Sequence, residues 1–424
     1  MTAQENSQDP HPSITGAPQS DPQSARPTVL SERPTVLIVK RSQLRPYIER
    51  WEKLASVALE CNPFYEPWTL LPAIEHLAAE SNLHFFLVFA PASSAAESEL
   101  LGFFPIEVTR SCLHLPIRTL TFWQHRYCFL NVPLIHRDYA WPVLELFWQW
   151  FESNPFGCHV LDTNRLPSEG RFHKIWSDFA LGRQSLILSD YPRAAFYSKG
   201  TGEECIASVF SKKHLREFRR QRRQLSELGK CEFHSITKPE DVDDWIDQFL
   251  EVESSGWKGG PNGGAFARFP SDVRYLRDIT HAGFRRGSVM LLSLKLDGKP
   301  IAVKHNLISG NAGFTFKIAF SEPFAKYSPG TLLELENIRI FVDELKLDRM
   351  DSCAAPRHPL MNRVFGEVLM VRQTLFSSSS RRGNFIIASL PLLRWIYNQF
   401  RSHQRSSNFH ISPKPTSQGG STHA

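Results

Sequence analysis

The sequence has no CxxC pair, and its seven cysteines are scattered between Cys61 and Cys353. Zinc sites and redox-active dithiols need cysteines paired at short spacing, so neither is expected, and we expect no bound metal. The odd number of cysteines favours a reducing compartment, and we expect a cytoplasmic protein. A run of about 18 uncharged apolar residues is also missing, so no membrane-spanning helix is predicted.

A strong excess of charge is absent as well. The chain has 49 basic and 43 acidic side chains, a formal net charge of +6. This mild excess suits an anionic ligand but does not by itself indicate nucleic-acid binding. At 424 residues, with 42% hydrophobic and 12% aromatic residues, the chain is long enough for two domains with large cores.

Two units of similar element order are predicted, at residues 35–195 and 196–401. Each reads as strand, helix, loop, helix, hairpin, strand, helix, judged from apolar spacing and turn residues. We interpret the chain as a tandem repeat of one α/β fold (α+β, with a mixed sheet) whose first copy is degenerate. Residues 1–34 and 402–424 are rich in polar residues and Pro and are expected to be disordered tails, the first without the apolar core of a signal peptide.

The segment from Phe385 to Phe400 is nearly apolar but contains Pro391 and Arg394. We expect a C-terminal helix that packs on the protein. An amphipathic helix on a membrane surface is the alternative, so peripheral membrane contact stays open.

The run from Tyr327 to Thr331 leaves an apolar strand through Ser-Pro-Gly and opens a helix. Such a helix start directs free N–H groups at one point and suits a phosphate. Pro329 is expected to bias Ser328 towards an extended backbone, and Gly330 lets a ligand approach the chain closely. An ordinary strand-to-helix loop is the alternative interpretation.

Polar side chains on the neighbouring apolar strands are further candidates. Lys304 and His305 are adjacent on one strand, so one of the two faces the site. Lys317 is a charge on an apolar strand that could bind an acceptor carboxylate or phosphate, or simply extend to water. Glu322 follows the end of that strand and is either a general base or a solvated loop acid.

A glycine-rich loop spans Gly256 to Gly264. It lacks the Gly-Lys-Ser/Thr ending of a P-loop. We interpret it as a lid over the acceptor, with Trp257 as its anchor and Lys258 as a further substrate contact; a flexible surface loop is the alternative.

These motifs resemble the GNAT N-acyltransferase superfamily, in particular its BioF2-like or CelD-like acetyltransferase branch. The resemblance runs over residues 196–375, and the first unit resembles the family's degenerate leading copy. FemAB-type aminoacyl transferases share the tandem arrangement. The segments that carry the resemblance are Lys212–Arg223, Ser255–Gly259, Leu296–Ala302 and Phe320–Gly330.

The resemblance implies an acyl-CoA donor, acetyl-CoA or another acyl-CoA, whose pantetheine arm pairs with the strand at 313–320. A strand N–H near its end would polarise the acyl carbonyl. The residues implied in donor binding are Lys317, Ala319, Phe320, Ser328, Gly330 and Thr331. The basic helix 212–223 presents either a solvated face or a contact for the 3′-phosphate of coenzyme A, a tRNA or an anionic membrane.

Direct attack of an amine or hydroxyl on the thioester then needs a base and a proton donor. Glu322 and His305 are the candidate bases. Many GNAT enzymes have a tyrosine acid where this chain has residues 356–370, and His358 is the obvious donor there. Substrate contacts are assigned to Trp257, Lys258 and Lys304.

The sequence therefore predicts an acyl-CoA-dependent N- or O-acyltransferase. Its acceptor would be a small molecule or saccharide, such as an amino-sugar or polysaccharide precursor. The alternatives are a FemAB-like transferase that uses aminoacyl-tRNA and an inactive binding protein on the same fold. Nucleic acid is otherwise not expected as a partner.

Overall fold

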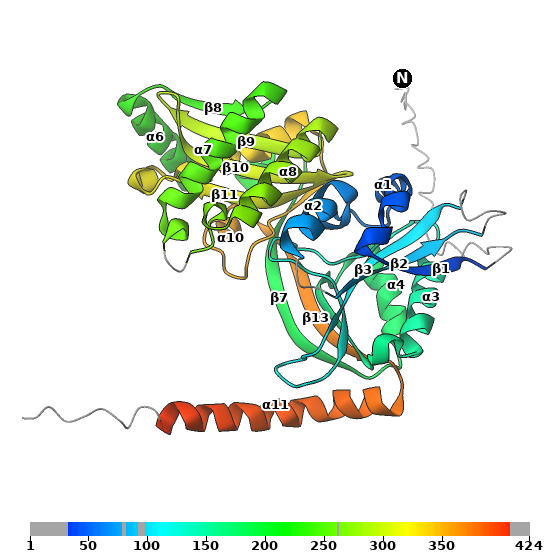
Figure 1. Ribbon diagram of the computed structural model, residues 1–424. Helices are drawn as coiled ribbons and strands as arrows, with labels where there is room; N and C mark the ends of the chain where they lie inside the picture. The colour runs from blue at the N-terminus through cyan, green and yellow to red at the C-terminus, as the bar shows by residue number, and fades with distance from the viewer. Residues whose placement is uncertain (1–32, 79–81, 92–97, 261–262, 408–424) are drawn as a thin grey trace, which may run out of the picture.

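The computed structural model describes residues 33–78, 82–91, 98–260 and 263–407 (Figure 1). Its strands form one continuous sheet in the order β1-β2-β3-β4-β6-β13-β7-β12-β11-β10-β9-β8, with β5 beside β3. Of the predicted disordered tails at 1–34 and 402–424, residues 1–32 and 408–424 lie outside the described residues.

The first unit contains β1 (Thr35–Lys40), α1 (Ile48–Ser56), α2 (Pro67–Leu77), β2 (Leu83–Phe89), β3 (Leu100–Thr109), β4 (Thr119–Phe122), β5 (Leu134–Ile135), α3 (Ala140–Glu152), β6 (Val160–Pro167), α4 (Gly170–Ala180) and β7 (Ser185–Tyr197). The second contains α5 (Gly202–Val209), α6 (Lys212–Leu228), β8 (Cys231–Ser235), α7 (Val242–Ser255), α8 (Pro270–Arg286), β9 (Val289–Leu296), β10 (Lys299–Ser309), β11 (Ala312–Phe320), α9 (Pro329–Arg339), β12 (Arg349–Asp351), α10 (Met361–Val364), β13 (Glu367–Ser377) and α11 (Arg381–Ser407).

The two units repeat one topology, as the sequence predicts. In each, an antiparallel run of strands ends in a parallel pair, β4 with β6 and β11 with β12. A helix joins the two members of each pair, because a parallel connection needs a crossover. The predicted tandem α/β fold with a mixed sheet is confirmed.

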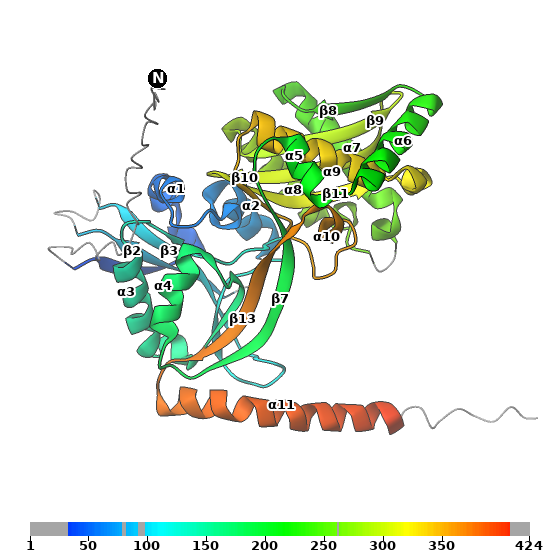
Figure 2. The ribbon, with the colours of Figure 1, turned by 180° about the vertical axis from the view of Figure 1, so that it is seen from behind.

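The units are joined by an exchange of their last strands (Figure 2). β7 ends the first unit but pairs with β12 of the second, and β13 ends the second unit but pairs with β6 of the first. β7 and β13 also pair with each other. The predicted domain boundary after residue 195 falls within β7, because this strand belongs to both halves of the sheet.

The ends of α6 and α11 can be compared with those expected from the sequence. α6 begins at Ser211, whose hydroxyl accepts from the His214 N–H, and it buries the stripe Phe218, Gln221 and Leu225. α11 buries Ile387 and Leu390 and continues as a helix to Ser407, into the segment predicted to be a tail. No helix in the described part of the chain is long and apolar enough to cross a membrane.

Candidate functional site

The parallel strands β11 and β12 separate after a short pairing. Ala312–Phe314 lie beside Arg349–Asp351, and no further pairs follow. On its other edge β11 stays paired with β10 as far as Phe320. The Ser321 N–H donates to the Ile301 carbonyl on β10, so the alternation of a strand directs the backbone groups of Phe320 into the gap.

A β-bulge lies at the root of this gap. His305 is opposite Lys317 and Asn306 is opposite Thr315, which leaves Phe316 as an extra residue on β11. The rings of Phe316 and Phe266 are 6.1 Å apart, and the Lys317 ammonium lies 5.2 Å from the Phe266 ring. The bulge thus turns two successive side chains to one face, and bulges are common beside active sites.

The helix α9 starts at the open end of the gap. Ser328 has φ 53° and ψ 48°, so the predicted extended conformation is wrong: the tight turn from η8 (Glu322–Tyr327) into α9 needs a left-handed residue here. No described side chain caps α9, and its first main-chain bond joins the Leu332 N–H to Ser328. A Cβ on Gly330 would lie 3.3 Å from the Phe320 ring, so a larger residue would crowd the loop.

Lys258 from the glycine-rich loop reaches into the gap. Its ammonium donates to the Ile318 carbonyl at 3.0 Å and lies 4.0 Å from a Glu253 carboxylate oxygen. Burial lowers the pKa of Lys258, while Glu253 opposes that shift. Lys258 thus occupies the strand edge that the resemblance assigns to the pantetheine arm. The loop residues 261–262 and the Trp257 side chain lie outside the described part of the structure.

Lys317 lies in an aromatic box built by both units. Its ammonium is 4.8 Å from the ring of Tyr127 and 5.9 Å from that of Phe129, both in the loop after β4. Phe266 closes the box from the second unit. Burial lowers the pKa of Lys317 to about 8, against the raising effect of Glu253. A lysine with this pKa exchanges protons near neutral pH.

Two buried carboxylates complete this face. Glu253 of α7 accepts from the Phe266 N–H at 2.9 Å through one oxygen, and its other oxygen has no hydrogen-bond partner among the described residues. Asp272 of α8 accepts from the Tyr127 hydroxyl at 2.5 Å and pairs with Arg126. Both lie in the interior, so the first unit is fixed directly against the second at this site.

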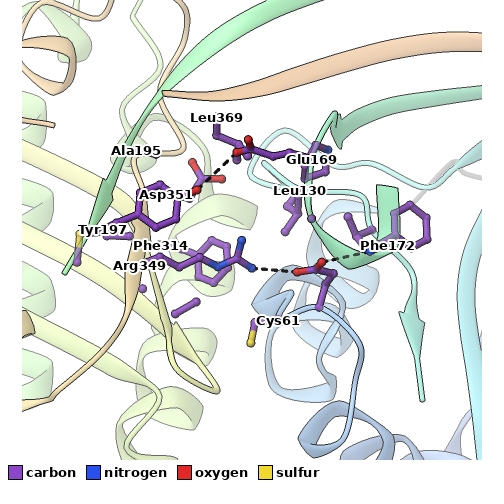
Figure 3. Close-up of a pocket in the computed structure, with 17 residues that line it drawn as sticks. Cys61, Leu130, Glu169, Phe172, Ala195, Tyr197, Phe314, Arg349, Asp351 and Leu369 are labelled. Carbon is purple, nitrogen blue, oxygen red and sulfur yellow. Dashed lines mark hydrogen bonds and ion pairs between the residues drawn. The ribbon is translucent and has the colours of Figure 1, made fainter. Parts of the chain in front are cut away.

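A cavity of about 270 Å³ lies between the units, over the paired root of β11 and β12 (Figure 3). The sheet contributes Phe314, Arg349 and Asp351, and the first unit contributes Glu60 and several apolar residues. Arg349 and Glu60 both line the cavity and form an ion pair at 3.2 Å. Phe314 is two residues from the bulge, so the cavity begins where the gap closes.

The other predicted residues have different surroundings. Lys304 and His305 are fully buried, so neither reaches a ligand in this conformation. Lys304 pairs with Glu334 of α9 at 2.6 Å, and His305 lies 3.0 Å from the Thr280 hydroxyl with its pKa lowered to about 3 by burial. These positions argue against the substrate role predicted for Lys304 and the catalytic role predicted for His305.

Glu322 and His358 stay near the gap. Glu322 is exposed, and its carboxylate lies 3.1 Å from where a Cβ on Gly256 would be. His358 accepts from the Met361 N–H at 3.2 Å through Nδ1. Burial and the Lys258 and Lys304 cations lower the pKa of His358. The neutral imidazole is therefore favoured, and less of the imidazolium form that could donate a proton is present.

Among the residues predicted to bind the donor, Gly330 and Thr331 lie in the first turn of α9, with Gly330 beside the Phe320 ring. The backbone of Ala319 faces β10. Glu253, Asp272 and Tyr127 were not predicted from the sequence. A signal existed for Glu253, because it continues the buried stripe of Ile246 and Phe249 on α7. No sequence signal pointed to Tyr127, because the residues that it contacts are distant in sequence. Within the described residues, no group of three His, Cys, Asp or Glu could hold a metal ion.

Comparisons with known proteins agree with this geometry. Residues 212–356 match a family model described as an acetyltransferase (GNAT) domain. A crystal structure of FemX shares 10% identity over 78% of this chain and 95% of that chain, with a TM-score of 0.52. No curated protein sequence matches the chain.

Two further solved structures are similar. One is a protein of unknown function from Bacteroides thetaiotaomicron, with 10% identity over 78% of this chain and 97% of that chain and a TM-score of 0.49. The other is a tandem GNAT protein from the clavulanic acid biosynthesis pathway, with 13% identity over 82% of this chain and 99% of that chain and a TM-score of 0.43. Of the three, FemX alone exceeds 0.5, and at this identity the likeness shows a shared fold.

Residues 212–356 are thus similar to a GNAT acetyltransferase domain, and the two units together have the fold seen in FemX. The matched residues all belong to the second unit. The predicted resemblance to the GNAT superfamily is thereby confirmed.

Proposed function

We propose that this protein is an acyl-CoA-dependent N- or O-acyltransferase. The observation that carries the proposal is the edge of β11 beyond Phe314, which pairs with no described strand and leads through η8 to the N-terminus of α9, which no described side chain caps. Together they offer main-chain groups for an amide-containing arm and N–H groups for a pyrophosphate. Acetyl-CoA is the simplest donor.

The donor would extend from α9 towards the bulge. Its pyrophosphate would lie over Ser328, Gly330 and Thr331, and its pantetheine arm would pair with the backbone of Ile318 and Phe320. The Lys258 ammonium now hydrogen-bonded to Ile318 has to move aside, so donor binding and movement of the glycine-rich loop are coupled. The thioester would then lie near the bulge, beside Lys317.

Lys317 is the base that the geometry supports best. A tenth or so of a lysine with a pKa of about 8 is neutral at pH 7, and this form accepts the proton that the acceptor loses as it attacks the thioester. The ammonium that results is stabilised by the aromatic rings and by Glu253. Glu322 is the second candidate, at the exposed side of the gap.

The acceptor would occupy the cavity between the units. Its wall is largely apolar, with Arg349, Glu60 and Asp351 as polar groups, which suits a molecule that has both hydroxyl or amine groups and a carbon skeleton. A small amine, an amino-sugar or an exopolysaccharide precursor has this chemistry.

Thermal unfolding with acyl-CoAs tests the proposal. Acetyl-CoA or a longer acyl-CoA should raise the Tm of the wild type. Gly330→Asp should abolish the increase, because it places a carboxylate at the pyrophosphate site. Ala207→Asp, on the exposed side of α5, adds the same charge and should keep the full increase. No increase with any acyl-CoA at millimolar concentration would refute the proposal.

A second candidate is an aminoacyl-tRNA-dependent transferase. It is favoured by the exposed basic face of α6. The buried side of the same helix packs against η8, where the Gln221 amide donates to the Lys326 carbonyl at 3.4 Å. A filter-binding assay with tRNA separates the two candidates. Affinity that falls steeply with rising salt would support the tRNA enzyme. Donor binding without turnover across many acceptors would instead indicate an inactive binding protein.

A further inference from the structure

α11 uses one side to pack on the protein. The buried residues Gly383, Ile387 and Leu390 recur at helical spacing, and Ile387 and Leu390 join a small cluster with Val160 and Leu375. From Pro391 to Trp395 every residue is exposed, because the helix leaves the body of the protein there (Figure 1).

The opposite side of α11 presents large apolar side chains to solvent. Phe385 is 73% exposed, Leu392 59% and Trp395 60%. Their spacing of seven and three residues places them on one stripe, facing away from Ile387 and Leu390. An exposed stripe of this kind marks a contact surface rather than a solvated face.

The charges on α11 are of one sign. Residues 381–407 contain five arginines and no aspartate or glutamate. Arg381, Arg382 and Phe385 line one shallow groove together with Arg118 of the first unit, so basic groups surround the start of the apolar stripe. Aromatic and aliphatic side chains on one face, with only basic charges around them, are typical of helices that lie in the surface of an anionic bilayer.

The end of the sheet beside α11 also exposes apolar side chains. Ser185 lies opposite Phe376, so the start of β7 lies beside the end of β13, from which α11 departs. Leu181 and Ile187 are 74% and 53% exposed at this end.

We propose that α11 docks the protein on an anionic lipid surface, with Phe385, Leu392 and Trp395 at the boundary between headgroups and acyl chains. A second copy of the chain could also cover the apolar stripe. Symmetric pairing through α11 would, however, bring two helices without acids together, whereas anionic lipid complements every charge on the helix. The proposal is independent of the acyl-transfer reaction.

Vesicle sedimentation of the full-length protein tests this inference. We expect binding to phosphatidylcholine vesicles that contain a quarter phosphatidylglycerol, weak binding to phosphatidylcholine alone, and release by high salt. Leu392→Ser with Trp395→Ser should lower the partition coefficient by about tenfold or more. The control Leu228→Ser removes a leucine that is 53% exposed at the end of α6 and should bind as the wild type does.

Arg381→Gln and Arg382→Gln should each lower partitioning by about fivefold, since a basic residue near such a surface contributes about 1 kcal/mol. Circular dichroism confirms that each variant is folded. Equal binding by the wild type and the Leu392→Ser, Trp395→Ser variant would overturn the proposal. A second outcome would also overturn it: light scattering shows that the wild type is a dimer and the variant a monomer, and the wild type does not bind vesicles.

Discussion

Replacing Lys317 by Met should make the protein more stable at pH 7 and less active. The folded protein lowers the pKa of Lys317 from 10.5 to about 8 because it buries the ammonium. That difference corresponds to about 3 kcal/mol at 1.36 kcal/mol per tenfold change in proton affinity. Partial exposure of the side chain and the attraction of its charge to three rings reduce the cost. We therefore expect the free energy of unfolding to rise by about 1–2 kcal/mol.

The pH dependence of this stability difference shows whether the buried charge of Lys317 causes it. Below pH 8 Lys317 is charged in both states, so the advantage of Lys317→Met is constant. Between pH 8 and 10.5 the unfolded state binds more protons, so the wild type gains stability with rising pH and the difference shrinks. Above 10.5 Lys317 is neutral in both states, and the advantage due to charge is gone.

Urea unfolding at pH 7 and pH 10 measures the free energy of unfolding of the wild type and of Lys317→Met. The control is Lys213→Met on the exposed face of α6, which should change this free energy by less than about 0.5 kcal/mol. A stability difference for Lys317→Met that does not change between these pH values would refute the reasoning. So would a destabilised variant at pH 7. In the proposed enzyme, Lys317→Met should also remove the rise of kcat/KM as the pH approaches 8.

Three further changes test the surroundings of the site. Lys304→Met should lower the free energy of unfolding by about 3–5 kcal/mol, because it leaves the Glu334 carboxylate buried and unpaired, and adding Glu334→Gln should recover part of the loss in urea titrations. His305 has a pKa of about 3 when folded and 6.5 as its ordinary value, so its contribution to stability is lost as the pH falls from 6.5 to 3, and His305→Gln should show a shallower loss between pH 7 and 4.5. Tyr127→Phe should cost about 1.5–3 kcal/mol through its bond to Asp272, and an unchanged Tm would contradict the contact between the units.

The elements of the second unit could be predicted from sequence because their signals are local. The Asp297-Gly298 turn and the apolar strands around it lie where expected, and the predicted repeat follows from the shared order of elements. The conformation of Ser328 could not be predicted. The residue before a proline prefers an extended backbone, but the turn between η8 and α9 overrides that preference.

The site was harder to predict than the fold. The alternation of strand side chains allowed either Lys304 or His305 to face a ligand, yet both are buried, Lys304 under α9 and His305 against Trp245 of α7. Lys317 was recognised as unusual because it interrupts an apolar strand. The aromatic box around Lys317 was not predicted, because Tyr127 and Phe129 come from the other unit. The local spacing of residues contains no information on that contact.

Amide hydrogen exchange with and without acetyl-CoA tests the central claim most directly. If the donor pairs with the open edge of β11 and its pyrophosphate lies at α9, exchange should slow in peptides that contain Ile318, Phe320 and Gly330. Peptides from the distant strand β1 should exchange unchanged. Binding of acetyl-CoA that protects other segments and leaves residues 315–332 unchanged would contradict the account.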